Sequence, residues 1–336
     1  MAAKTMVPKM KLLEEALRGS VRALGKLISL IEDHAEESQG ILKEIYPHTG
    51  RARVIGITGP PGVGKSTLVG GLTEKFLERE LSVGILAVDP SSPISGGSLL
   101  GDRIRFSSLS TSDKVFIRSL SSRGALGGLS QATMNVVRLL DAAGRDVIIV
   151  ETIGVGQDEI EIAHVADTMV LVLAPGFGDE IQALKAGIIE LADIFAVNKV
   201  DIAGANMYVA ILEKIVCDVT SGKRWIPPVV KTSALHNQGM EDLVTEIDNH
   251  ALFLRENETR MQLKKSKVRR EILRLTDKCV RNRLEDFLEK CSDLDDTLVS
   301  EVMEGRKDPY SATNQLVNLF WESFREKPKE EKQKRK

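Results

Sequence analysis

The chain has 336 residues, of which 42% are hydrophobic and 28% charged, and its formal net charge is −2. This length and composition are typical of a globular protein with one large α/β domain plus additions, or with two domains. The near-neutral charge argues against general nucleic-acid binding, no apolar run approaches the roughly 20 residues of a membrane span, and three cysteines without C-x-x-C spacing fit a reducing cytoplasm. We therefore expect a cytoplasmic protein that binds neither nucleic acid nor membrane.

The first 50 residues are predicted to be a helical extension. Apolar side chains such as Leu17, Leu24 and Ile28 recur at spacings near the 3.6-residue period of an α-helix. Gly19 and Gly25 interrupt this pattern, so it does not predict one unbroken helix.

A phosphate-binding loop follows. Residues 52–58 are apolar and β-branched, as in a buried parallel strand, and residues 67–78 place apolar side chains on one helical face. Between them the chain reads G-x-x-x-x-G-K-S, in which glycines let backbone amides surround a phosphate at the start of a helix. Lys65 is expected to reach the β and γ phosphates, and the Ser66 hydroxyl to ligate Mg²⁺. The residues expected to hold the nucleotide here are Gly59, Pro60, Pro61, Gly62, Val63, Gly64, Lys65, Ser66 and Thr67.

The next predicted strand, residues 81–88, ends in Asp89. An acid at the carboxyl end of a strand beside the phosphate loop is well placed to hold Mg²⁺ or its waters. A Gly- and Ser-rich stretch then leads to Asp102 and Arg103. Two interpretations of Asp102 stay open from spacing alone: it belongs to a loop whose order changes with the nucleotide, or it is the N-cap of a following helix.

Residues 146–150 form a strand that is predicted to be buried, and Glu151 follows it at the Walker-B position. Gly154 is placed to offer its N–H to a γ-phosphate, a contact that hydrolysis removes. Gln157 is a candidate for orienting the attacking water, with a solvated loop residue as the alternative.

A late strand, residues 193–197, is followed directly by Asn198, Lys199 and Asp201. The Asp201 carboxylate matches the N1–H and exocyclic amine donors of guanine, which adenine lacks, while Asn198 braces the loop and the Lys199 stem covers the ring. After the last predicted strand, residues 229–232, the backbone N–H of Ala234 is a candidate for recognising guanine O6. Together with residues 198–201, three residues after this strand are expected to bind the base: Ser233, Ala234 and Leu235.

The pattern predicts four regions. Residues 1–50 form the helical extension, and residues 51–254 form a GTP-binding domain with the α/β fold of P-loop NTPases, a mostly parallel sheet flanked by helices. Residues 255–325 are charged helices with a narrow apolar stripe, which predict dimerisation or partner binding, or alternatively a lid over the domain. Residues 326–336 are a charged tail expected to be disordered.

The chain resembles the methylmalonyl-CoA mutase-associated GTPases, the MeaB/ArgK group within the SIMIBI class. The resemblance runs from the N-terminal helices to residue 311 and is most particular in residues 88–103, 150–157 and 174–187. It implies a homodimeric GTPase, with GTP or GDP and Mg²⁺ as ligands, that serves an adenosylcobalamin-dependent acyl-CoA mutase in cofactor loading and protection.

By motif match, the resemblance also implies specific roles. The Mg²⁺ neighbourhood would comprise Ser66, Asp89, Asp102 and Glu151, and Lys185 would stabilise transition-state charge when the partner is bound. With these, the residues predicted to serve catalysis are Lys65, Glu151, Gln157 and Lys185.

Two rival functions share the nucleotide domain. A metallochaperone GTPase for nickel or zinc insertion would require Cys or His clusters with ligand spacing, which the sequence lacks. A kinase acting on periplasmic amino-acid-binding proteins would require a site for a protein hydroxyl, which no motif here predicts.

Overall fold

A computed structural model describes residues 2–33, 35–89, 112–121, 128–152, 158–176, 189–256 and 259–325. The chain forms two compact units, Met1–Asn257 and Glu258–Lys336. Within the described residues, no helix combines the length and apolar character that a bilayer crossing needs.

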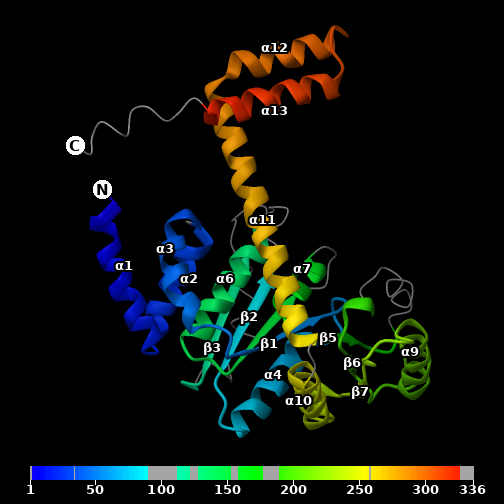
Figure 1. Cartoon of the computed structure of the whole chain (residues 1–336). Helices are drawn as coiled ribbons and strands as arrows, with labels where there is room; N and C mark the ends of the chain where they lie inside the picture. Colours follow the sequence, from blue (N-terminus) through cyan, green and yellow to red (C-terminus); the bar gives the residue numbers. More distant parts are fainter. Residues whose placement is uncertain are drawn as a thin grey trace. The chain divides into compact units, whose positions relative to one another are not determined.

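The first unit contains a seven-stranded sheet in the order β3-β2-β4-β1-β5-β6-β7. Every pair of neighbouring strands is parallel, which confirms the expected α/β class with a parallel sheet (Figure 1). The strands are β1 Arg53–Thr58, β2 Val83–Asp89, β3 Val115–Ser121, β4 Val147–Thr152, β5 Thr168–Leu173, β6 Ile194–Val197 and β7 Val229–Lys231.

Helices cover both faces of this sheet, as the continuous apolar strands require. One core joins β1, β2 and β4 to α4 and α10, and a second joins the other face of these strands to α2, α6 and α7. The helices of the first unit are α1 Ala2–Leu17, α2 Val21–Asp33, α3 Ala35–Ile45, α4 Lys65–Glu78, α6 Gly128–Ala142, α7 Asp158–Val165, α9 Ala205–Val219 and α10 Met240–Glu256, with short 3₁₀ turns η1 Tyr46–His48, η3 Ile189–Leu191 and η4 Ala234–His236.

The N-terminal extension is three helices packed on the sheet domain. The break expected at Gly19 is present, where the backbone takes a φ of +94° between α1 and α2. The interruption expected at Gly25 is wrong, because this residue lies inside α2 and the helix continues through it. Five apolar side chains of α2 are buried, and their packing outweighs the roughly 1 kcal/mol that a glycine costs a helix.

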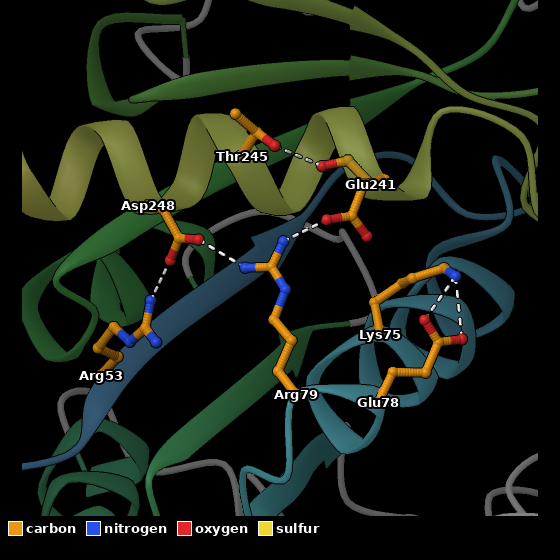
Figure 2. A network of polar contacts seen from close by, with 7 residues as sticks. All are labelled: Arg53, Lys75, Glu78, Arg79, Glu241, Thr245 and Asp248. Atoms are coloured by element: carbon orange, nitrogen blue, oxygen red, sulfur yellow. Dashed lines mark hydrogen bonds and ion pairs between the residues drawn. The ribbon is translucent and has the colours of Figure 1, made fainter.

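Helix α10 is tied to α4 and β1 by a network of ion pairs (Figure 2). Asp248 of α10 accepts from Arg53 at the start of β1 and from Arg79 at the end of α4, the latter at 2.6 Å. Arg79 also pairs with Glu241, on the first turn of α10. Helix α10 begins just after η4. The network therefore also holds the segment that contains η4 close to α4.

The second unit consists of α11 Thr259–Lys290, α12 Ser292–Met303 and α13 Pro309–Arg325. Phe287 of α11 meets Phe320 of α13 edge to face, with ring centroids 5.7 Å apart. Phe320 is buried, and so is Leu298 of α12.

Candidate functional site

The phosphate loop predicted at residues 59–67 begins at the carboxyl end of β1, between β4 and β5. In a parallel sheet the carboxyl ends of the strands meet at one edge, where ligands of α/β proteins bind. The loops after β4, β6 and β7 start at this same edge. Among the described residues, the fold therefore brings the predicted phosphate loop, Glu151 and the predicted base residues to one side of the sheet.

Two glycines allow the loop to take this path. A Cβ at Gly59 would lie 2.0 Å from the backbone oxygen of Val172 on β5, so any larger residue would push the loop off the sheet. Gly64 has a φ of +94°, and a Cβ there would lie 2.5 Å from the side-chain amide nitrogen of Asn198. The loop thus has glycine where it passes closest to β5 and to Asn198.

The loop ends at the N-terminus of α4, whose N-cap Gly64 makes no side-chain capping hydrogen bond. Helix N-termini carry unpaired N–H groups and a positive dipole end, which suit an anion such as a phosphate. Lys65, the first residue of α4, is only 7% exposed. Its ammonium donates to the carbonyls of Gly59, at 2.6 Å, and Pro60, at 2.8 Å, so this charge is held over the loop.

Ser66 and Glu151 meet although 85 residues separate them. The Ser66 hydroxyl donates to Glu151 Oε1 at 2.6 Å, and Glu151 is 7% exposed at the end of β4. A hydroxyl that donates its proton to a carboxylate still has oxygen lone pairs for a cation. Hard oxygen donors of this kind fit Mg²⁺, which takes one or two protein ligands together with phosphate oxygens and water.

Among the described residues, no group of three or more His, Cys, Asp or Glu side chains is arranged to hold a metal ion. Asp89 is the last residue of β2 and lies at the same edge of the sheet, but the structure describes only its backbone. Asp102, Gly154, Gln157 and Lys185 lie outside the described residues altogether.

Asn198 joins the predicted base loop to the phosphate loop. Its amide nitrogen donates to the carbonyl of Val63 at 2.9 Å, and its Oδ1 accepts from the backbone N–H of Ala234 at 2.9 Å. The neighbouring Lys199, with a φ of +59°, donates through Nζ to the carbonyl of Gly62 at 2.7 Å. Asn198 therefore contacts both loops, and its bracing role in nucleotide binding stays a prediction.

The contact made by Ala234 adds a constraint to the sequence-based expectation. Because its N–H already donates to Asn198, recognition of guanine O6 by this group requires that hydrogen bond to be shared or released. Leu235, next in the chain, is 80% exposed. An apolar side chain that is so exposed beside the base loop is suited to cover one face of a planar base.

Asp201 is exposed and accepts the hydroxyl of Ser233 at 2.5 Å. This hydrogen bond is the main reason why the pKa of Asp201 lies below its usual value. Asp201 is therefore a carboxylate throughout the neutral range. A carboxylate accepts hydrogen bonds and donates none, as pairing with two donors on a base edge requires.

Two residues without a sequence-based assignment complete this loop. The Thr232 hydroxyl is buried and lies 3.3 Å from Asn198 Oδ1. Gln238 exchanges both backbone hydrogen bonds with Ser233, at 3.0 and 3.1 Å, which closes the turn that carries Ala234 and Leu235. No local pattern marks either residue, because each acts through a contact that only the fold creates.

The chain matches known proteins over most of its length. The model of the family described as methylmalonyl Co-A mutase-associated GTPase MeaB matches residues 22–289. A relative from Pyrococcus horikoshii, provisionally named a GTPase, is 43% identical over 316 residues, which are 93% of this chain and 98% of the relative. GTPase ArgK of Escherichia coli is 36% identical over 237 residues, covering 67% of this chain and 71% of ArgK.

Two further matches extend this similarity. The methylmalonic aciduria type A homolog of Caenorhabditis elegans, a mitochondrial protein, is 34% identical over 261 residues, which are 70% of this chain and 64% of the relative. A crystal structure titled LAO/AO transport system kinase aligns with a TM-score of 0.71 and 25% identity, covering 94% of this chain and 98% of that one. These matches confirm the P-loop GTPase fold and the predicted enzyme class, a GTPase that binds GTP and GDP. The chain belongs to the family of methylmalonyl-CoA mutase-associated GTPases, the MeaB/ArgK group.

Proposed function

We propose that this GTPase binds an adenosylcobalamin-dependent acyl-CoA mutase in the cytoplasm and gates the loading and protection of the mutase cofactor. Methylmalonyl-CoA mutase is the first candidate partner. The observation that carries this proposal is the family match over residues 22–289, because the family is described by its association with that mutase. The name of the Caenorhabditis elegans relative, which refers to methylmalonic aciduria, supports the same metabolic context.

GTP is proposed to lie across the sheet edge with its phosphates on residues 59–67. Asp201 would accept from the guanine edge, with Asn198 and Lys199 holding the two loops together. Residues 233–235 would complete the base site. The joint placement of these groups at one edge of the sheet supports this assignment.

Catalysis would then consist of positioning and charge stabilisation. Lys65 supplies a buried positive charge at the start of α4, close to the N–H groups of the phosphate loop. Negative charge that develops on the phosphate oxygens is stabilised there without solvent reorganisation. Gln157 remains a candidate for orienting water because of its position just beyond Glu151. Lys185 remains a candidate for partner-dependent charge stabilisation on the resemblance alone.

Mg²⁺ is proposed to be held by Ser66 and Glu151, with Asp89 and Asp102 directly or through water. The Ser66–Glu151 hydrogen bond of 2.6 Å supports the first two. When bound, the ion neutralises charge on the β and γ phosphates. Glu151 would also accept a hydrogen bond from the Ser66 hydroxyl, which turns the serine lone pairs toward the cation.

We also propose a homodimer formed through the second unit. Residues 259–283 hold ten Lys or Arg and two acidic residues, whereas residues 284–304 hold eight acidic residues and one Lys. Two antiparallel copies of α11 would place the basic stretch of each beside Glu285, Asp286 and Glu289 near the end of the other. Ile272, Leu275 and Cys279 share one face of α11 and are exposed, which supplies an apolar seam between such copies.

Replacing Ile272 and Leu275 together by glutamate is expected to weaken dimerisation by at least about 100-fold, because two buried apolar side chains stabilise a seam by about 1.5–3 kcal/mol each. Sedimentation equilibrium measures the change, and raising the salt concentration should weaken the wild-type dimer by screening. Leu252→Glu is a matched control, since Leu252 is an exposed leucine of α10 in the first unit. A wild-type monomer would contradict the homodimer and favour a lid over the chain's own domain.

The partnership is tested by the affinity of the mutase for this protein with GDP, with a non-hydrolysable GTP analogue and with no nucleotide. The γ-phosphate would order loops that the mutase reads, so we expect at least about a tenfold difference between the two nucleotides, which is a typical coupling free energy of about 1–3 kcal/mol. Asp201→Asn should remove the difference with guanine nucleotides, and Asp242→Asn, on exposed α10 surface, should keep it. Absence of mutase binding in every state would contradict the proposal, and nickel or zinc enzymes would be tried next.

A further inference from the structure

We infer that Thr152 is a positioning residue for GTP hydrolysis, acting through a hydroxyl pair with Thr58. Thr152 Oγ1 donates to Thr58 Oγ1 at 2.9 Å, and the two residues are 1% and 2% exposed. Thr58 is the last residue of β1 and Thr152 the last residue of β4. The inference rests on the proposed roles of the phosphate loop and of Glu151.

The sheet register explains why these two hydroxyls meet. Strands β1 and β4 are parallel, with Ile57 opposite Glu151, so the next residue on each strand faces its counterpart. Successive side chains point to opposite faces of a sheet. Glu151 therefore lies on the face of Ile149, which packs in the core with α4, and Thr152 lies on the face of Val150, which packs in the core with α6 and α7.

Glu151 and Thr152 are consecutive residues of β4, and each forms a hydrogen bond at a different end of the phosphate loop. Glu151 accepts the hydroxyl of Ser66, at the far end of the loop. Thr152 bonds Thr58, immediately before Gly59, where the loop begins. Any displacement of the end of β4 would move both contacts, so the hydroxyl pair fixes where the Glu151 carboxylate lies relative to the loop.

The opposite side of the loop start is also fixed. Gly59 lies so close to Val172 on β5 that a Cβ there would be 2.0 Å from the Val172 oxygen. Backbone pairing of β1 with β4 and with β5 also runs to the end of β1. The hydrogen bond between Thr58 and Thr152 is the side-chain contact here that an isosteric substitution can remove without changing the backbone.

The chemistry of the pair argues for a positional role. Two valines would fill the same space in an apolar interior without the cost of burying hydroxyl groups. A hydrogen bond, unlike an apolar contact, sets both a distance and a direction. The threonine pair thus ties two strand ends at a defined separation at the place where Glu151 and the phosphate loop must be aligned.

Four variants distinguish a positioning role of Thr152 in hydrolysis from an effect on the stability of the protein. They are Thr152→Val, Thr58→Val, the double variant and Thr152→Ser. GTP hydrolysis is measured against GTP and Mg²⁺ concentration, together with thermal unfolding. Thr152→Val is expected to lower kcat about five- to tenfold, the effect of losing a hydrogen bond of about 1 kcal/mol, and to raise the Mg²⁺ requirement, with KM for GTP changed less than about twofold. Thr152→Ser should keep the wild-type kcat.

The double variant gives the sharpest result. Each single valine leaves a buried hydroxyl unpaired and lowers Tm, whereas two valines remove both hydroxyls and restore it. We expect kcat to stay low in the double variant although Tm recovers. Thr73→Val is the matched control, because Thr73 is buried on α4 and its hydroxyl donates only within its own helix, to the carbonyl of Val69 at 2.7 Å.

Recovery of kcat together with Tm would overturn the inference, since the pair would then matter for packing alone. A wild-type kcat in Thr152→Val would overturn it as well. Glu151→Gln separates these results from a failure of the proposed function. If Glu151→Gln loses activity and Thr152→Val does not, the proposed site is supported and the positioning role of Thr152 is contradicted. If Glu151→Gln keeps full activity, both the proposed site and the positioning role are contradicted.

Discussion

Replacing Lys65 by alanine is expected to lower kcat/KM for GTP about 10²–10³-fold, which is the typical cost of removing one group that stabilises transition-state charge. The Lys65 ammonium is buried, lies at the N-terminus of α4 and is held by the carbonyls of Gly59 and Pro60. Alanine leaves those carbonyls and the helix but removes the charge. Steady-state hydrolysis of GTP measures the loss.

Lys75→Ala is the matched control for this prediction. Lys75 lies on the same helix, and its ammonium pairs with Glu78 at 2.8 Å (Figure 2), away from the loop. A surface ion pair of this kind contributes little to stability, so hydrolysis should stay within about twofold of wild type. Equal losses in the two lysine variants would contradict a specific role for Lys65.

The second large effect is a change of base preference. Asp201→Asn is expected to weaken GTP binding at least about 10²-fold, because the carboxylate accepts from two donors of guanine and an amide N–H cannot. Xanthine carries a carbonyl where guanine carries its exocyclic amine, so the side-chain amide N–H of this variant would then have an acceptor. Binding of XTP should improve as binding of GTP weakens. Equilibrium titration with GTP, XTP and ATP measures both the loss of GTP affinity and the gain of XTP affinity. An unchanged GTP affinity would contradict the proposed contact between Asp201 and guanine.

The pH dependence follows from the Ser233 hydroxyl. Since this hydrogen bond holds the pKa of Asp201 below its usual value, the carboxylate persists as the pH falls through the ordinary aspartate range. GTP binding that depends on this carboxylate is therefore present above the lowered pKa and lost only below it. Ser233→Ala should move the loss of binding to higher pH, which titration of GTP affinity against pH measures.

Much of the fold is predictable from local pattern because its parallel strands are buried on both faces. Strand β4, for example, begins with the continuous apolar run of residues 147–150 and ends in the polar pair Glu151 and Thr152. The N-terminal helices show where local pattern fails. Gly25 interrupts the apolar periodicity, yet α2 passes through it because packing of Leu24 and Ile28 on the domain determines the helix.

The candidate site also has one part that local sequence predicts and another part that it does not. The phosphate loop and the 198–201 stretch are short contiguous motifs, so their residue types and spacing suffice to predict them. The pairing of Thr58 with Thr152, and of Asn198 with both Val63 and Ala234, joins residues 36 to 135 positions apart. Such contacts depend on strand order and register, which a single sequence does not encode in any local pattern.

The most direct measurement is an experimental structure of the protein with GDP and Mg²⁺. We expect the phosphates to lie on residues 59–67, the ion to contact the Ser66 hydroxyl on the side of Glu151, and Asp201 to bond N1 and the amine of guanine. Thr58 and Thr152 should stay hydrogen-bonded. A guanine base held by other residues, or an ion placed away from Ser66 and Glu151, would contradict the proposed site.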